Sequence, residues 1–492
     1  MSRKRLLLIL LVVLLLPGLA LAVPLADKVV EHRLANGLRL LVVERHETPT
    51  VAAYITIGVG SVHETSETRG VAHFLEHLLF KGTTTLGTTD YAAERSLLEA
   101  IEQVGSELDR LRLQPDADPA RVAALQVRLQ ELQERHRPFV VKDVYSQLYS
   151  QNGAVGFNAF TSKDLTTYLV SLPANKLELW ALLESARMQD AVLREFYTER
   201  EVIHEERRRA YETNPGGLLY ETLLATAFTV HPYRNPIIGW HSDIANLSLA
   251  ETRDFLGRYY APVNTTIALV GAVPAADAIA LVERYFGAIA AGEPVPPVAA
   301  VEPPQRAEKR VTVQFDAEAR LAMAYHKPTL PSREDYVFDL IDQILGQGRT
   351  SRLYQRLVER EQLATDVAVY SAPGSRYPNL FVIEAVPRHP HTAAEVEAAI
   401  VAELERLRSE EVSATELAKA RNRLLTDNLR ALRSNSGLAR LLTTYQTVTG
   451  DWRYLVSYEE RLNELTAADV QAVARAWFTP QNRTVVVVTR DP

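Results

Sequence analysis

The sequence of 492 residues contains no cysteine. This absence excludes disulfide bridges, cysteine nucleophiles, thiolate metal ligands and a lipidated cysteine. Runs of three basic residues occur only at residues 3–5 and 207–209, and the formal net charge is −7. A surface of that sign offers no basic field to the phosphate backbone, so we do not expect nucleic-acid binding.

The N-terminus has the pattern of a signal peptide. Residues 3–5 read Arg-Lys-Arg, an apolar run fills residues 6–16, and residues 20–22 read Ala-Leu-Ala. The run is too short to cross a bilayer as a stable helix. We expect cleavage after Ala22, which removes three positive charges, changes the net charge from −7 to −10 and leaves no stable membrane span. An exported chain without disulfides fits a periplasmic location.

The rest of the chain is too long for one hydrophobic core. Residues 291–305 read AGEPVPPVAAVEPPQ, and a segment so rich in proline is typical of a stiff, extended linker. We expect this linker to separate an N-terminal domain, residues 23–290, from a C-terminal domain, residues 306–492.

The two predicted domains end alike. Residues 247–266 and 465–484 align without a gap at a constant offset of 218, and each predicts a capped helix, a turn and a β-branched strand. Two unrelated units could share this turn chemistry, but the gap-free offset favours duplication. Since strands and helices alternate without a βαβ rhythm, we predict an α+β fold of two homologous domains. Each is a mostly antiparallel sheet covered by helices.

The first domain contains a predicted insertion at about residues 99–150. Two charged, amphipathic stretches flank the segment 114–119, which contains two prolines, and apolar residues recur at helical spacing from Val122 to Leu132. We expect a helical hairpin whose apolar stripe is a packing seam.

One short motif indicates metal chemistry. Residues 73–77 read His-Phe-Leu-Glu-His, in a stretch that favours a helix up to Gly82. His73 and His77 would share one face, and such a pair can bind a single zinc ion at about 2.0–2.1 Å per Zn–N bond. Glu76 would emerge beside that face, as the catalytic base that activates a zinc-bound water. The alternative is a pair of surface or hydrogen-bonded histidines.

A catalytic zinc site needs a third protein ligand and an open position for water. Residues 199–206 read Glu-Arg-Glu-Val-Ile-His-Glu-Glu, with Glu199 and Glu206 two turns apart on one helical face. Spacing alone does not choose among these two residues, Glu201 and Glu205. The whole run could also be a solvated helix face.

Several dispersed motifs, taken together, match a known family. They are HFLEHLLFKGT at the histidine pair, FNAFTSKDLTTY at 157–168, EREVIHEE at 199–206, HPYRNPIIG at 231–239 and GQGRTSRLYQRLVE at 346–359. The chain resembles the inverzincins, the zinc metallopeptidases that include pitrilysin, insulin-degrading enzyme and the mitochondrial processing peptidase.

The resemblance assigns roles to particular residues. It implies one zinc ion per chain, with Glu206 as the third ligand and Glu199 as a supporting residue nearby. It also implies that an extended peptide substrate adds as a strand beside Asn158 and Ala159, although these two could belong to an ordinary core strand.

Two features depart from the family. The 128 residues between His77 and Glu206 exceed the usual spacing, which the inserted hairpin explains. Many members also carry an Arg and a Tyr in the second domain that grip the substrate, but Val358 and Thr365 stand at those positions here. The chain therefore resembles the zinc-binding subunit of two-subunit members, and we expect a homologous partner subunit that supplies the Arg/Tyr pair, or a homodimer.

The sequence thus predicts a zinc metalloendopeptidase that hydrolyses unfolded or short polypeptides. The alternative is a non-catalytic scaffold or a peptide-binding subunit of a two-chain complex.

Overall fold

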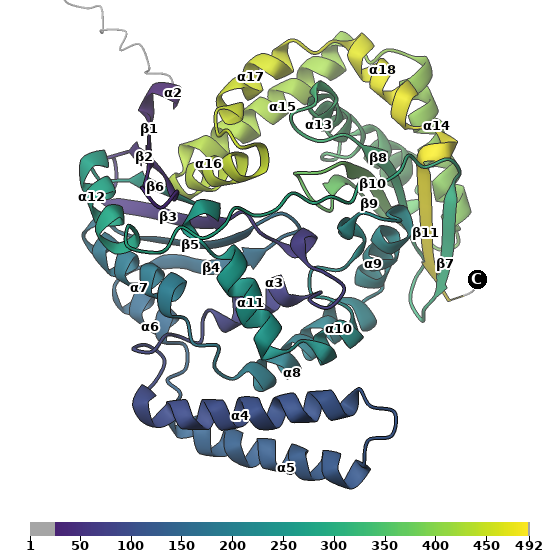
Figure 1. Ribbon diagram of the computed structural model, residues 1–492. Helices are drawn as coiled ribbons and strands as arrows, with labels where there is room; N and C mark the ends of the chain where they lie inside the picture. The colour runs from purple at the N-terminus through teal and green to yellow at the C-terminus, as the bar shows by residue number, and fades with distance from the viewer. Residues whose placement is uncertain (1–24, 491–492) are drawn as a thin grey trace, which may run out of the picture.

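The structure is a computed structural model that describes residues 25–490. The predicted signal peptide, residues 1–22, lies outside the described residues. Within the described part of the chain, no helix is both long and apolar enough to cross a membrane. Two sheets, each mostly antiparallel and covered by helices, confirm the predicted α+β fold of two homologous domains (Figure 1).

The first sheet has six strands in the spatial order β1-β2-β6-β3-β5-β4. Neighbouring strands are antiparallel except β2 and β6, which are parallel. The strands are β1 Val29–Arg33, β2 Arg39–Glu44, β3 Thr50–Ile57, β4 Val155–Thr161, β5 Thr166–Pro173 and β6 Thr265–Gly271. Strand β4 is the last on its side, and its outer edge pairs with no other strand of residues 25–490.

The second sheet has five strands in the order β7-β11-β8-β10-β9, and only β7 and β11 are parallel. The strands are β7 Lys309–Gln314, β8 Arg320–Lys327, β9 Ala364–Ala372, β10 Asn379–Pro387 and β11 Arg483–Thr489. This order repeats β2-β6-β3-β5-β4 of the first sheet, so β1 is the one strand without a counterpart in the described chain.

Each sheet packs one face against helices of its own domain. On the first sheet these include α3 Val71–Leu78, α7 Leu177–Asp190, α11 Leu249–Tyr259 and α12 Ala275–Phe286. On the second sheet they include α13 Arg333–Leu345, α14 Ala393–Ser409 and α18 Ala467–Trp477. Alternation along each strand divides its side chains between two cores: in β2, Leu40 and Val42 join this core, whereas Leu41 and Val43 point to the opposite face.

That opposite face is covered, in each sheet, by a helix from the other domain (Figure 1). The two crossing helices are α9 Pro215–Ala227 and α16 Asn435–Thr449. Leu223 of α9 shares a buried apolar cluster with Val486 of β11, and Leu442 of α16 shares another with Ala268 of β6. Each domain therefore completes the core of the other.

The repeat seen in the sequence extends to hydrogen-bonding detail. Ser248 and Glu251 form a capping box at the start of α11, and Thr466 and Asp469 form the same box at the start of α18. Strands β6 and β11 also keep the offset of 218 at both ends. Further helices are α2 Leu25–Lys28, α6 Val144–Gln151, α8 Phe196–Arg207, α10 His241–Asn246, α15 Ala414–Arg433 and α17 Tyr454–Asn463.

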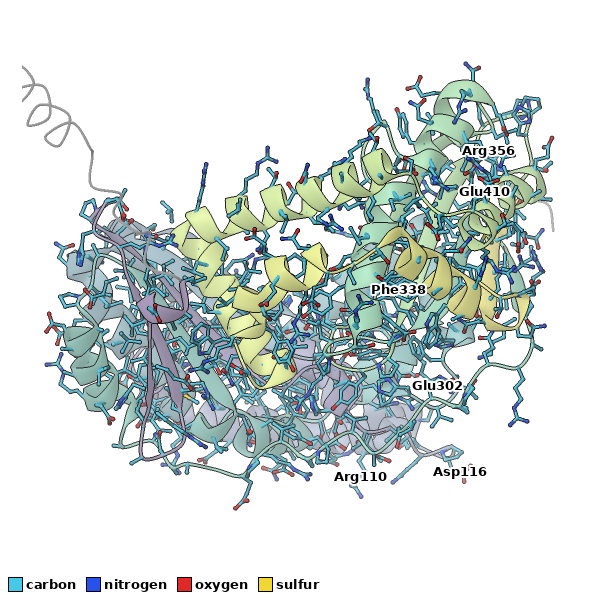
Figure 2. The ribbon with its side chains drawn as sticks, turned by 90° about the horizontal axis from the view of Figure 1, so that it is seen from above. Arg110, Asp116, Glu302, Phe338, Arg356 and Glu410 are labelled. Atoms are coloured by element: carbon cyan, nitrogen blue, oxygen red, sulfur yellow. The ribbon has the colours of Figure 1, made fainter. Side chains whose placement is uncertain are left out.

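The predicted hairpin is formed by α4 Tyr91–Arg112 and α5 Pro119–His136, and it projects from the first domain (Figure 1). Seen from above, Arg110 and Asp116 at its tip lie at the margin of the molecule (Figure 2). A seam of buried leucines, Leu125, Leu129 and Leu132, runs along α5.

The hairpin begins earlier and ends earlier than the predicted 99–150. Its start is set by Asp90, whose side chain accepts a hydrogen bond from Ala93 N at 3.1 Å and caps α4. Its end is set by the turn after His136, beyond which residues 144–151 form the separate helix α6.

The proline-rich segment 291–305 contains no helix or strand. Glu302, labelled in Figure 2, accepts hydrogen bonds from the backbone nitrogens of Thr229, Val230 and His231 at 2.7, 2.8 and 2.9 Å. These bonds fasten the segment to the first domain. We keep residues 23–290 and 306–492 as the proposed domains on either side of it.

Candidate metal centre

Helix α3 carries the two histidines of the motif. It begins after Gly70, whose φ of 89° is left-handed and where a Cβ would lie 2.6 Å from Ile238 O, so only glycine fits. The carboxylate of Glu64 accepts hydrogen bonds from Gly70 N and Ala72 N, each at 2.9 Å. These bonds satisfy donors of the first turn, which have no partner within the helix.

The helix ends at Leu78 rather than at the predicted Gly82. One face is buried in the domain core and consists of Val71, Ala72, Phe74, Leu75 and Leu78. His73, Glu76 and His77 are only partly buried and lie off that face. The apolar spacing thus turns the three polar side chains away from the core.

Helix α8, which packs on α3, supplies the acidic residues. It begins after Glu195, a non-glycine residue with a φ of 56°, and contains both Glu199 and Glu206. Directly after it, residues Arg208–Glu212 form a π-helical turn. Such turns are frequent at functional sites.

Three predicted ligands converge between these helices. One side-chain atom each of His73, His77 and Glu206 lies within 4.8 Å of the others, a group that could hold a metal ion. The Glu206 carboxylate faces both rings: Oε1 lies 3.5 Å from His73 Nε2, and Oε2 lies 3.6 Å from His77 Nε2. Both distances exceed those of good hydrogen bonds, so the three groups meet without bonding to one another.

Burial and neighbouring groups together shift the pKa values of these three side chains. Burial, with the nearby charge of His77, lowers the pKa of His73 to about 3. Burial also raises the pKa of Glu206 above its usual range. Burial opposes a charge on His77, but its hydrogen bond with Glu199 and the surrounding carboxylates outweigh burial and raise its pKa.

Glu199 supports His77 from behind. Its Oε1 lies 2.9 Å from His77 Nδ1, and its Oε2 lies 2.5 Å from Lys81 Nζ, which also approaches Glu195 at 3.4 Å. Burial disfavours the carboxylate, but the hydrogen bonds from His77 and Lys81 prevail and lower the pKa of Glu199 to about 2. A hydrogen bond at Nδ1 leaves Nε2 of His77 directed toward Glu206, as in histidines that bind metals.

The other predicted carboxylates have different surroundings. Glu205 is paired with Arg208, with Oε2 at 2.9 Å from Nη2, and Glu201 is exposed. Of the four candidates that spacing left open, only Glu206 reaches the two histidines within the described chain.

Glu76 lies beside the group but outside it. Thr161 at the end of β4 donates a hydrogen bond to Glu76 Oε2 at 2.6 Å. Burial raises the pKa of Glu76, and the bond from Thr161 offsets part of that effect. A carboxylate with a raised pKa beside a metal centre has the properties of a general base.

Asn158 and Ala159 stand on the edge strand β4. Asn158 pairs with Leu169 and its side chain is exposed, whereas Ala159 pairs with Tyr168 and its side chain is buried. The edge at which a peptide could add is therefore present. Nothing in the fold distinguishes these two residues from the rest of the strand.

Two hollows adjoin the candidate metal ligands. A cavity of about 550 Å³ is lined by Glu76, His77, Phe80, Lys81, Glu199, Val202 and by residues 140–143 that follow the hairpin. A more open hollow of about 720 Å³ is lined by Glu206 and its neighbours on α8. All of these lining residues belong to the first domain.

Sequence reasoning did not assign Lys81 or Thr161. Both lie in motifs that carried the family resemblance, and the period of two along β4 puts Thr161 on the same side as the buried Ala159. That signal could have identified Thr161. Lys81 bonds to residues more than a hundred positions away, so spacing could not have found it.

Comparison with known proteins agrees with this fold. A family model described as insulinase (peptidase family M16) matches residues 39–110, and one described as the peptidase M16 inactive domain matches residues 246–424. The first includes His73, Glu76 and His77. The chain belongs to peptidase family M16, as the sequence motifs predicted.

Named relatives point to the same class. Zinc protease PqqE of Helicobacter pylori is 26% identical over 461 residues, covering 92% of this chain and 91% of that protein. The uncharacterized zinc protease YmxG of Bacillus subtilis is 24% identical over 342 residues, 68% of each chain. The crystal structure of a protease from Helicobacter pylori matches with a TM-score of 0.79 and 25% identity, over 94% of this chain and 99% of that one.

Proposed function

We propose that this chain is a zinc metalloendopeptidase that cleaves unfolded or short polypeptides. The observation that carries the proposal is the convergence of His73, His77 and Glu206 without hydrogen bonds among them. Three partly buried polar groups that meet without pairing leave a place for a further partner, and a cation is the simplest one.

The donor set fits zinc. Ligand atoms about 2.1 Å from one zinc ion in tetrahedral geometry lie about 3.4 Å apart. Glu206 approaches His73 Nε2 through Oε1 at 3.5 Å and His77 Nε2 through Oε2 at 3.6 Å, so its carboxylate lies about one edge length from each nitrogen. Three protein ligands also leave a fourth position for water, the arrangement of catalytic rather than structural zinc sites.

A bound zinc ion would supply Lewis-acid polarisation of the substrate carbonyl and would acidify water. In the proposed mechanism Glu76 takes the proton from the attacking water and delivers it to the leaving amine, while Thr161 holds its carboxylate. Glu199 fixes the ring of His77. We further propose that the substrate lies along the free edge of β4, where Asn158 and Ala159 would pair with its backbone.

We propose that a partner subunit, or a second copy of the chain, completes the substrate site. The hollows at the metal centre are lined by the first domain alone. Val358 packs against the core of the second domain, and the hydroxyl of Thr365 donates to Val386 O. Neither side chain is available to grip a substrate. We also propose export to the periplasm, on the strength of the N-terminal sequence pattern.

The test is zinc binding and peptide cleavage by the purified chain, with Glu206→Gln beside Glu205→Gln. The two variants differ by one position on the same helix. We expect wild type and Glu205→Gln to hold one zinc ion each, and Glu206→Gln to lose it, because only Glu206 faces the histidines. Metal content is measured by atomic spectroscopy after dialysis, and cleavage with a mixed set of quenched peptides.

The outcomes separate the possibilities. Zinc binding with cleavage by a purified chain that is monomeric in solution would support the peptidase and refute both a partner subunit and a second copy. Zinc binding without cleavage would support a site that needs its partner. A wild-type chain that binds no zinc would refute the proposal in favour of a scaffold, and loss of zinc from Glu205→Gln alone would mean that the ligand is misassigned.

A further inference from the structure

Helix α8 has two faces with different neighbours. Glu199, Val202 and Glu206, spaced three or four residues apart, line the hollows at the metal centre. Tyr197 and Arg200, on another side of the helix, are buried against the inserted hairpin. The helix that bears the proposed third ligand is therefore supported from behind by the insertion.

The central contact of this support is an ion pair between Arg200 and Asp109 of α4. The guanidinium donates two hydrogen bonds to the carboxylate, each at 2.9 Å, and a third to Leu247 O at 3.2 Å. Arg200 is only 3% exposed, so the pair is shielded from water. A bidentate pair in such a place fixes orientation as well as distance.

Two further contacts lie on either side of the ion pair. The ring of Tyr197 rests on Gly105 of α4, where a Cβ would come within 2.0 Å of it. Gln133 of α5 donates to Thr198 Oγ1 at 3.1 Å. Both arms of the hairpin therefore hold the first turns of α8.

A buried network fastens the hairpin to the chain just before α8. Arg194 is fully buried and donates to Glu94 of α4 at 2.8 Å and to Thr83 O, beyond the end of α3, at 2.6 Å. His136 of α5 lies 2.7 Å from the same Glu94 oxygen. The segments that adjoin α3 and α8 thus meet both hairpin arms at one cluster.

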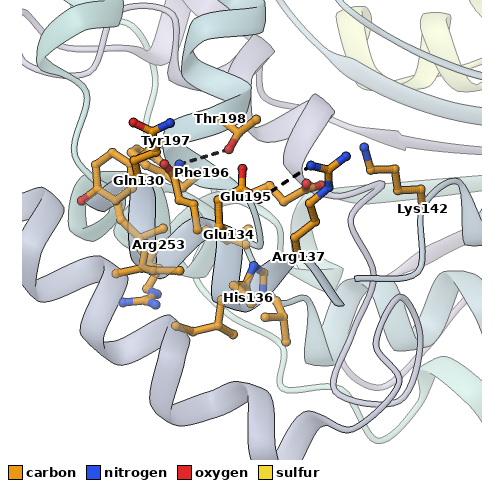
Figure 3. Close-up of a pocket in the computed structure, with 16 residues that line it drawn as sticks. Gln130, Glu134, His136, Arg137, Lys142, Glu195, Phe196, Tyr197, Thr198 and Arg253 are labelled. Carbon is orange, nitrogen blue, oxygen red and sulfur yellow. Dashed lines mark hydrogen bonds and ion pairs between the residues drawn. The ribbon is translucent and has the colours of Figure 1, made fainter. Parts of the chain in front are cut away.

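Part of the junction between the hairpin and the start of α8 is not filled by side chains, so the polar contacts there carry much of this support. A cavity of about 260 Å³ separates the hairpin from the start of α8. Figure 3 shows residues of both walls, Gln130 and His136 from the hairpin and Phe196 and Thr198 from α8. Where side chains border a void they lose dispersion contacts, so the specific bonds across it decide the position of the helix.

We propose that the inserted hairpin is a positioning element of the metal centre and that Arg200, held by Asp109, is its positioning residue. The inference rests on the proposed zinc site. Glu206 lies six residues beyond Arg200, about 9 Å along the helix axis, so a rotation of α8 that follows release of Arg200 moves the Glu206 carboxylate away from the histidines. The insertion would then account for part of the metal affinity without contributing a ligand.

The experiment compares Asp109→Asn and Arg200→Met with the control Arg121→Met. Arg121 forms an ion pair with Glu107 at 2.6 Å, which joins the two hairpin arms but does not touch α8. The zinc dissociation constant is measured by competition with a chromogenic chelator, together with the unfolding midpoint of the metal-free protein. We expect zinc binding about tenfold weaker for Asp109→Asn and Arg200→Met, as for other residues that orient ligands, and unchanged affinity for the control.

A second readout separates positioning from general damage. With zinc in excess, the cleavage activity of Asp109→Asn should return to the wild-type level, since the ligands and Glu76 are intact. If Arg200→Met does not fold, the test of the inference rests on Asp109→Asn, because asparagine keeps the shape of the aspartate side chain. Wild-type zinc affinity in Asp109→Asn would overturn the inference and leave the proposed function standing, whereas a wild-type chain that binds no zinc would overturn both.

Discussion

The two domains share a fold but differ in what their equivalent helices carry. Helix α13 follows β8 as α3 follows β3, and aligning Leu78-Leu79 with Ile344-Leu345 places Asp339 opposite His73 and Asp342 opposite Glu76. Helix α15 corresponds to α8 at the offset of 218, which places Leu424 opposite Glu206. The second domain keeps the scaffold and has an apolar residue in place of the proposed ligand Glu206.

The carboxylates of the second domain are also used differently. Asp339 accepts a hydrogen bond from Tyr458 Oη at 3.0 Å, and Asp342 accepts from Gln347 Nε2 at 3.2 Å. The two aspartates are thus satisfied within their own domain, whereas His73, His77 and Glu206 of the first domain converge without bonding to one another. The comparison teaches that both domains offer an equivalent position on the fold. The candidate site is distinguished by side chains that meet there without bonding to one another.

The largest expected effect comes from exchanging the two equivalent carboxylates for amides. Glu76→Gln should lower peptide cleavage by about 10²- to 10⁴-fold and keep the zinc, because it removes the base and no ligand. Asp342→Asn should leave cleavage unchanged. Rates with quenched peptides and metal content would be measured for both. Equal losses of cleavage rate in both variants would show that the two carboxylates contribute equally to activity.

A smaller effect tests what the domains have in common. Leu223 of α9 and Leu442 of α16 are both fully buried, each on the sheet of the other domain. Replacing either by Ala should lower the free energy of unfolding by about 2–5 kcal/mol. Since each helix completes the other domain's core, denaturant unfolding followed by fluorescence and circular dichroism should show one shifted transition. Two transitions, only one of them shifted, would mean that the domains unfold independently.

The sequence predicted the repeated fold well because its signal is local. The capped helix, turn and strand at Thr265–Gly271 recur at a fixed offset and need no knowledge of distant contacts. Which helix covers which sheet could not be predicted in this way. Helices α9 and α16 bring together residues from opposite domains. The amphipathic spacing of a helix indicates that one face is buried, but it does not indicate which sheet buries that face.

The residues of the candidate site also differ in whether a local signal in the sequence could identify them. His73 and His77 follow from spacing within one helix, but Glu206 needed the family resemblance, because Glu199 shares its helix face and Glu205 is its neighbour. The structure separates the three by their partners. The zinc, peptide and partner assignments remain predictions that the experiments above address.

The smallest expected effect concerns the equivalent helix caps. Both domains have a capping box, but only Asp469 also pairs with Arg333, at 2.6 Å. The hydrogen bond from Arg333, followed by those from Thr466, lowers the pKa of Asp469 to about 2 from its usual 3.8. A carboxyl whose pKa is lower in the folded than in the unfolded state stabilises the folded state at pH values above its unfolded-state pKa. This contribution is lost as the pH falls toward 2.

Asp469→Asn should therefore lower the free energy of unfolding near neutral pH by about 1 kcal/mol, because a cap and an exposed ion pair are lost. The difference from wild type should shrink as the pH falls from 4 toward 2, because the wild-type carboxylate is then protonated as well. The matched variant is Glu251→Gln in the first domain. Because Glu251 has no arginine partner among the described residues, this variant should lower the free energy of unfolding by less than Asp469→Asn does at neutral pH. Thermal unfolding of all three proteins at several pH values measures this. A difference that does not depend on pH would mean that the charge of Asp469 contributes nothing, and that the two caps are equivalent.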